Sequence, residues 1–221
     1  MHITIVGASD KYAGGFASWA VAARCHVAIV GPSRGQAEAF AKKINAATAT
    51  GPHDPIVDNV IFLAMPYNCV LDARDFYGRQ LDGRIVVDLT TPIDFETFEP
   101  IHPEAGSAAQ EITKARPGAR VVKAFNPMFV GPWEPEQNST QQTRDVFLAG
   151  DDVEAKHLIA QFFDVGGLRP IDVGPLQRAR ELEAAGYLSI AARLSLEAGF
   201  VAGQLGGRRA AGSRIAQEKK R

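Results

Sequence analysis

The sequence predicts an α/β fold in which a doubly wound, mostly parallel sheet precedes a short helical C-terminal part. Short β-rich runs alternate with helical segments, and several runs are apolar at every position. A strand with that composition is buried on both faces, as in a parallel sheet covered by helices on each side. The alternation of strands and helices predicts βαβ units.

The predicted strands are rich in Val, Ile, Leu and Phe. They cover 3–6, 27–30, 60–64, 84–89, 120–125, 145–149 and 169–173, with a weaker candidate at 47–50. Helices are expected over 14–24, over 34–45 behind a Ser33–Gln36 capping box, over 152–164 behind Asp151 with Glu154 three residues later, and from Pro175 to about 203. Loops are expected at 51–58, 90–105 and 126–143.

The composition excludes several classes of protein. The 24 basic and 25 acidic residues leave a formal net charge of −1, which argues against a nucleic-acid binder. Cys25 and Cys69 cannot form a disulfide framework, and the five histidines lack the spacing of a zinc site, so no metal is expected. No apolar run is long enough for a membrane span, and the N-terminus lacks the pattern of a secretory signal. We therefore expect a cytoplasmic protein.

The first turn, GASDKYAGG, joins a strand to a helix, where backbone N–H groups can bind a phosphate. It departs from the G-x-G-x-x-G pattern, because Gly7 is followed by Ser9 and Asp10. A carboxylate beside a pyrophosphate is repulsive unless Lys11 offsets it. Asp10 can instead cap the helix, which would make this an ordinary βα turn.

The end of the second strand favours a dinucleotide that carries a 2′-phosphate. A free ribose 2′-hydroxyl calls for a carboxylate here, whereas this chain reads Gly31-Pro32-Ser33-Arg34. The Arg34 guanidinium can hold a phosphate through two charge-assisted hydrogen bonds. The turn thus predicts a preference for NADP over NAD; in the alternative, Ser33 only caps the next helix and Arg34 is solvated.

Four later segments resemble a known family, the NADP-dependent oxidoreductases related to the coenzyme F420 (8-hydroxy-5-deazaflavin):NADP reductases. They are VIFLAMP at 60–66, GRIVVDLTTPIDFE at 83–96, GARVVKAFNPMF at 118–129, and the run LAGDDVEAKH to LQRARELE at 148–183. The resemblance covers nearly the whole chain, and its last two segments are the most specific. Two departures are Thr91 in "TTP" and Pro127 in "FNP", where the family has Asn and Thr. They suggest an acceptor other than the usual deazaflavin.

The resemblance implies a Rossmann domain, a homodimer, and NADP(H) lying across the carboxyl edge of the sheet. A deazaflavin of the F420 type, or another small-molecule redox substrate, would stack on the nicotinamide. Matched by position to the family's motifs, the phosphates would be faced by Gly7, Ser9, Asp10, Lys11 and Tyr12, and the 2′-phosphate by Ser33 and Arg34. The central part of the cofactor would be lined by Ala64, Met65 and Pro66, and the nicotinamide by Thr90, Thr91 and Pro92. A second pocket would be bordered by Lys123, Ala124, Phe125 and Asn126.

Hydride transfer between stacked rings needs little proton chemistry from the protein. If the acceptor is an imine or carbonyl, a proton donor is required, and Lys123 and Tyr12 are the first candidates, ahead of Tyr67. Lys123 can instead close a strand end in an ion pair, and Tyr67 can be a packing residue that starts a helix. Asp88 is expected to bond to loop N–H groups rather than to act as a base.

The expected organisation is a Rossmann domain at 1–173, a helical segment at 174–205 and a basic, solvated tail at 206–221. An apolar stripe from Leu182 to Leu196 serves either a dimer interface or the cover of the sheet. Two further hypotheses stay open. One is an NADPH-dependent reductase of a small imine, quinone or flavin, and the other is a non-catalytic dinucleotide sensor, which Asp10 would favour.

Overall fold

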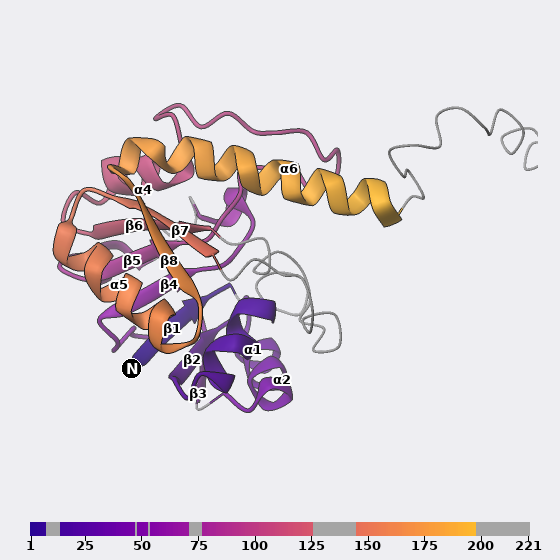
Figure 1. Cartoon of the computed structure of the whole chain (residues 1–221). Coiled ribbons are helices and arrows are strands. Elements are labelled where there is room, and N and C mark those ends of the chain that lie inside the picture. Colours follow the sequence, from indigo (N-terminus) through magenta and orange to yellow (C-terminus); the bar gives the residue numbers. More distant parts are fainter. Residues whose placement is uncertain (8–13, 47, 53, 71–76, 126–144, 198–221) are drawn as a thin grey trace, which may run out of the picture. The chain divides into compact units, whose positions relative to one another are not determined.

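The computed structural model describes residues 1–7, 14–46, 48–52, 54–70, 77–125 and 145–197, with side chains described up to 192. The chain divides into two compact units, Met1–Tyr187 and Leu188–Arg221. The first unit holds an eight-stranded sheet with helices on both faces (Figure 1). Within the described residues, no helix has the length and apolar character needed to cross a membrane.

Strands and helices alternate along the chain, as predicted. The strands are β1 (His2–Val6), β2 (His26–Val30), β3 (Thr48–Thr50), β4 (Val60–Leu63), β5 (Ile85–Asp88), β6 (Arg120–Phe125), β7 (Asp145–Gly150) and β8 (Arg169–Gly174). The helices are α1 (Gly14–Ala22), α2 (Arg34–Ile44), α4 (Ala108–Ala115), α5 (Val153–Val165) and α6 (Ala179–Glu197), with 3-10 turns η1 (Gly78–Leu81) and η4 (Leu176–Arg178). Every predicted strand is confirmed, including the weak one.

The sheet order is β3-β2-β1-β4-β5-β6-β7-β8. Strands β1 to β6 are parallel, β7 runs antiparallel to β6, and β8 is parallel to β7. The chain leaves β1 toward β2 and β3 on one side and returns to β4 on the other. In open sheets of this kind, ligands bind in the crevice at that switch point, beyond the carboxyl ends of the strands.

The continuous apolar runs are explained by a core on each face of the sheet. In β4, Val60 and Phe62 join the cluster that packs under α1, α2 and α5, whereas Ile61 and Leu63 join the cluster under α4 and η4. Successive side chains of a strand point to opposite faces, so both must be apolar. Figure 1 shows this arrangement, with α1 and α2 beside β1–β3 and α4 beside β6.

The helix starts confirm one predicted cap and correct another. Ser33 caps α2, since its hydroxyl accepts a hydrogen bond from the Gln36 backbone N–H at 3.3 Å. The cap of α5 is Asp152, not Asp151: Asp152 accepts from the Ala155 N–H, whereas Asp151 accepts from the Leu176 N–H. The last helix was expected to carry Pro175 in its first turn. It begins instead at Ala179, after the 3-10 turn η4.

Asp152 also receives two hydrogen bonds from the Arg120 guanidinium, at 2.5 and 2.9 Å. These bonds, together with the Ala155 N–H, lower the pKa of Asp152 to about 2. A carboxyl group whose pKa is lower in the folded than in the unfolded protein stabilises the fold at pH values above its unfolded pKa. That stabilisation is lost as the pH falls through the folded pKa.

We therefore expect Asp152→Ala to cost about 1 kcal/mol of unfolding free energy at pH 7, the usual cost of losing a cap. The difference from the wild type should shrink as the pH falls from about 4 to about 2. Urea unfolding across this range measures it. Asp152→Asn, which keeps an acceptor for the Ala155 N–H, should cost less at pH 7. A cost that stays constant down to pH 2 would show that the charge is unimportant.

Candidate functional site

The carboxyl ends of the parallel strands lie in register along one edge of the sheet. Val6 pairs in register with Val30 of β2 and with Leu63 of β4, and Leu63 pairs with Asp88 of β5. Asp88 in turn pairs with Lys123 of β6. The next residue on each strand, including the predicted cofactor residues Gly7, Ala64 and Ala124, therefore lies in the following row along the edge.

Gly7 packs closely against Met65 at the switch point. Its φ is +84°, and a Cβ placed on it would lie 2.4 Å from the Cβ of Met65. Its N–H donates to the Val30 carbonyl at 2.7 Å, which holds the end of β1 against β2. The structure thus brings Gly7 and Met65 together, as expected for two residues of one site. A side chain at position 7 would collide with Met65, and the positive φ also favours glycine there.

The corner beyond β2 carries the residues predicted to hold the 2′-phosphate. Ser33 and Arg34 are both exposed at the start of α2. The Arg34 guanidinium, 58% exposed, forms an ion pair with Asp54 at 2.6 Å. The same Asp54 oxygen accepts the Gly51 N–H at 2.7 Å, in the turn after β3. An exposed pair of this kind contributes no more than about 1 kcal/mol, so a phosphate can displace it.

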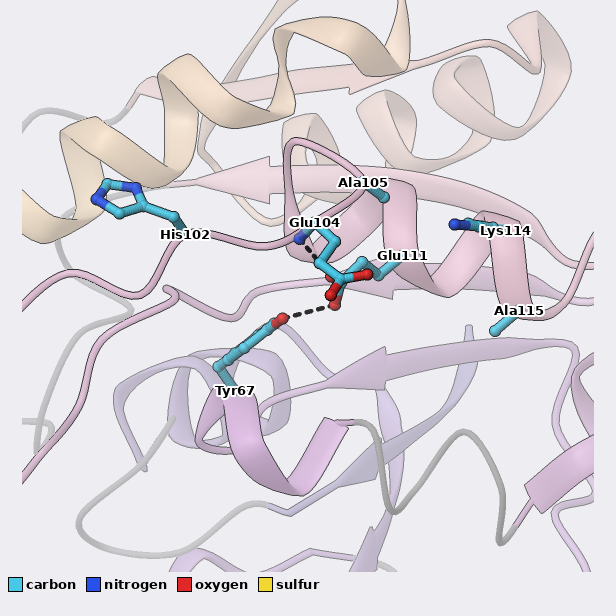
Figure 2. Close-up of a pocket in the computed structure, with 7 residues that line it drawn as sticks. All are labelled: Tyr67, His102, Glu104, Ala105, Glu111, Lys114 and Ala115. Atoms are coloured by element: carbon cyan, nitrogen blue, oxygen red, sulfur yellow. Dashed lines mark hydrogen bonds between the residues drawn. The ribbon is translucent and has the colours of Figure 1, made fainter.

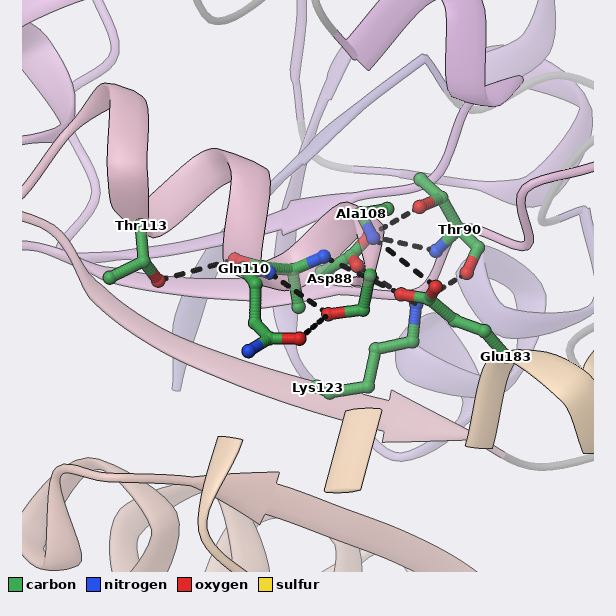
Figure 3. Close-up of polar contacts among 9 residues, drawn as sticks. Asp88, Thr90, Ala108, Gln110, Thr113, Lys123 and Glu183 are labelled. Atoms are coloured by element: carbon green, nitrogen blue, oxygen red, sulfur yellow. Dashed lines mark hydrogen bonds and ion pairs between the residues drawn. The ribbon is translucent and has the colours of Figure 1, made fainter. Parts of the chain in front are cut away.

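A buried ion cluster joins the ends of β5 and β6 to α4 and α6 (Figure 3). The Lys123 ammonium lies 2.8 Å from an Asp88 oxygen and 3.0 Å from a Glu183 oxygen, and it donates to the Thr90 carbonyl. Asp88 accepts from the Thr90 N–H and hydroxyl, at 2.9 and 2.7 Å. Glu183 accepts from the first N–H groups of α4, where the helix dipole favours a negative charge.

The cluster places two carboxylates and one ammonium in a buried site. Burial alone disfavours the charged form of Lys123, but Asp88 and Glu183 outweigh it and raise the pKa of Lys123 above its usual value. Burial also raises the pKa of Glu183. An ammonium has three donors, and all three are used here. The geometry thus favours the ion-pair interpretation of Lys123; its role as a proton donor stays a prediction. Asp88 bonds to the loop N–H, as expected.

The loop after β5 is held from two sides. Thr90 is 3% exposed and its hydroxyl bonds to Asp88, so its side chain faces the protein rather than a ligand. Pro92 is also buried, whereas Thr91 is partly exposed. A Cβ on Gly186 of α6 would lie 2.6 Å from the Thr91 hydroxyl, so this helix packs closely on the loop. Thr91 is therefore the member of this predicted trio that is not fully buried, although its side chain packs against Gly186.

A polar cavity of about 510 Å³ lies between α4 and the helical residues 67–70 that follow Pro66 (Figure 2). Tyr67 is buried and donates to a Glu111 oxygen at 2.6 Å, and the other Glu111 oxygen accepts the Glu104 N–H. Burial, followed by the Glu111 carboxylate, raises the pKa of Tyr67. Tyr67 is thus buried and hydrogen-bonded within the protein, which fits a packing residue; its role stays a prediction.

Several predicted site residues lie outside the described residues. They are Ser9, Asp10, Lys11 and Tyr12 of the first turn, Asn126 and Pro127 of the acceptor-side loop, and the basic tail 206–221. Two residues of the site were not predicted, namely Asp54 and Glu183. The sequence holds a weak signal for Asp54, since Gly51-Pro52-His53-Asp54 is turn-like and follows a strand; Glu183 carries no local signal.

The strand order, with its switch point at the end of β1, defines a Rossmann-type fold. Comparison with known proteins agrees with the predicted resemblance. The chain is 29% identical over 131 residues to the F420-dependent NADP reductase of Methanocaldococcus jannaschii, across 57% of this chain and 58% of that protein. It is 35% identical over 128 residues to the metalloreductase STEAP3 of Rattus norvegicus, across 57% of this chain and 24% of that one.

The similarity to a solved structure extends further along the chain. A protein of Arthrobacter sp. FB24 assigned as an F420-dependent NADP reductase matches with a TM-score of 0.72 at 21% identity, over 89% of this chain and 94% of that one. No family model matches the chain. The chain spans 58% of the curated F420-dependent NADP reductase and 24% of the metalloreductase. The resemblance to the F420-dependent NADP reductases and the Rossmann-like fold are confirmed.

Proposed function

We propose that the chain is an NADP(H)-dependent oxidoreductase that transfers hydride between the nicotinamide and a deazaflavin of the coenzyme F420 type. The observation that carries the proposal is the corner beyond β2, where Ser33 and Arg34 stand exposed and the β2 turn itself offers no carboxylate. The similarity to the F420-dependent NADP reductase supports the same reaction class.

The described residues fit an NADP cofactor along the sheet edge. Arg34 would hold the 2′-phosphate, Gly7 at the end of β1 would face the pyrophosphate, and Met65, Pro66 and Thr91 would line the nicotinamide half. When bound, the nicotinamide supplies the hydride. The protein contributes distance, orientation and exclusion of water, and the buried cluster around Lys123 holds the loop that carries Thr91 in place.

We further propose a homodimer located in the cytoplasm. The proposal rests on the F420-reductase resemblance and on the apolar stripe of α6, in which Leu182 is buried against Phe125 and Ala149 in the first unit. That contact uses the start of the stripe to cover the sheet. The stripe from Leu188 onward belongs to the second unit. Size-exclusion chromatography with light scattering measures the oligomeric state directly.

Titration with NADPH and with NADH, followed by nicotinamide fluorescence, tests the cofactor assignment. We expect tighter binding of NADPH, and oxidation of bound NADPH on addition of oxidised F420, read at the deazaflavin absorbance band. A panel with a flavin, a quinone, a cyclic imine and ferric citrate tests the other acceptor classes. Turnover on one of these alone would assign that class instead, and NADPH binding without any turnover would identify a sensor.

A further inference from the structure

The Arg34 guanidinium is already engaged by Asp54 in the structure. The two atoms lie 2.6 Å apart, and the same Asp54 oxygen accepts the Gly51 N–H. Asp54 stands in the turn after β3, the strand next to β2, with Val30 and Thr50 in register at the ends of the two strands. The carboxylate therefore lies at the same edge of the sheet as the proposed phosphate corner.

A phosphate bound by Arg34 would have to share or displace this carboxylate. The Asp54 side chain is 32% exposed and Arg34 is 58% exposed, so the pair is wet and weak enough to open. A carboxylate that stays within a few ångströms of a phosphate dianion repels it. On both counts Asp54 opposes binding of the 2′-phosphate, whereas a cofactor with a free 2′-hydroxyl meets neither obstacle.

Resting on the proposed function, we propose that Asp54 is a specificity-determining residue that competes with the 2′-phosphate for Arg34 and so limits the preference for NADPH over NADH. A carboxylate is also the group that other dinucleotide sites present to a ribose hydroxyl. Asp54 thus brings the affinities for NADPH and NADH closer together. It follows β3, whereas the carboxylate of those other sites follows β2.

Asp54→Asn tests this proposal, because asparagine keeps a carbonyl oxygen for the Gly51 N–H and removes the charge. The dissociation constants of NADPH and NADH are measured by nicotinamide fluorescence at fixed ionic strength. We expect the NADPH constant to fall about two- to fivefold, the range that an exposed ion pair spans, and the NADH constant not to fall. In the Arg34→Ala background, most of the gain should disappear.

Asp164→Asn is the matched control, since it removes one carboxylate from the exposed end of α5 and should change neither constant. An NADPH constant that is unchanged or higher in Asp54→Asn overturns the proposal, and so does an equal fall for both cofactors. Failure of the proposed function looks different, because the wild-type protein itself would then bind neither cofactor, and the inference would fall with it. A thermal melt of each variant confirms that it is folded.

Discussion

Replacing Lys123 with methionine is expected to lower the free energy of unfolding by about 3–5 kcal/mol near neutral pH, the range found when one partner of a buried ion pair is removed. Lys123 is 1% exposed and is the cation that faces both Asp88 and Glu183. Methionine fills a similar volume but leaves two carboxylates close together without a counterion. Urea unfolding followed by circular dichroism measures the loss.

The loss should depend on pH in a defined direction. Without Lys123, the folded state holds its carboxyl pair best with one proton bound, so the pKa of that pair lies above its unfolded value. A folded state that binds more protons than the unfolded state gains stability as the pH falls. The deficit of Lys123→Met relative to the wild type should therefore shrink between about pH 7 and pH 5.

Two further variants complete this experiment. Lys114→Met removes an exposed cation from α4 and should change stability by no more than about 0.5 kcal/mol. Glu183→Gln keeps an acceptor for the α4 N–H groups and leaves Lys123 paired with Asp88, so it should cost less than Lys123→Met. A deficit of Lys123→Met that is small, or independent of pH, would contradict the electrostatic account of the cluster.

The same variant separates the two roles considered for Lys123. If Lys123 only closes the strand ends, Lys123→Met assayed well below its melting temperature should bind NADPH and retain part of its turnover. If Lys123 gives a proton to the acceptor, NADPH binding should survive while turnover is lost. The buried ammonium, committed to Asp88, Glu183 and the Thr90 carbonyl, leads us to expect the first outcome.

The strands were predictable because each carries its own signal. Both faces of β4 are buried, so Val60 to Leu63 are apolar without interruption; β1 and β5 are also buried on both faces and mostly apolar. Helix α4 was missed although Ser107 caps it and Gln110 stands three residues later. It lies directly after a long polar loop, and its eight residues bury only Ala108, Ala109 and Ile112, so its apolar stripe is short.

The place of the candidate site residues in the fold was predictable, but their pairings were not. The edge of the sheet follows from the strand ends, which is why Gly7, Met65 and Arg34 lie where the sequence placed them. The partners of the charged groups come from distant segments. Glu183 is separated from Lys123 by 60 positions in the sequence, and Asp54 from Arg34 by 20 positions. No local sequence pattern could therefore reveal either contact.

Replacing Arg34 with alanine is expected to raise the dissociation constant of NADPH about tenfold to a hundredfold while leaving that of NADH nearly unchanged. A hydrogen bond to a charged group contributes about 1.5–3 kcal/mol, and each 1.4 kcal/mol is a factor of about ten in affinity. Breaking the existing pair with Asp54 offsets part of this gain in the wild type, by up to about 1 kcal/mol. Fluorescence titration of both cofactors measures the change in their ratio.

Lys42→Ala is the matched control, because it removes one exposed cation from the last turn of the same helix. Its effect on the dissociation constants should be small and equal for the two cofactors. The difference between Arg34→Ala and the wild type should become smaller as salt is added to both proteins, because salt screens exposed charges. An NADPH-to-NADH preference that survives in Arg34→Ala would place the 2′-phosphate elsewhere. Asp54 would then be an ordinary surface partner of Arg34, and the corner beyond β2 would lose its role in choosing the cofactor.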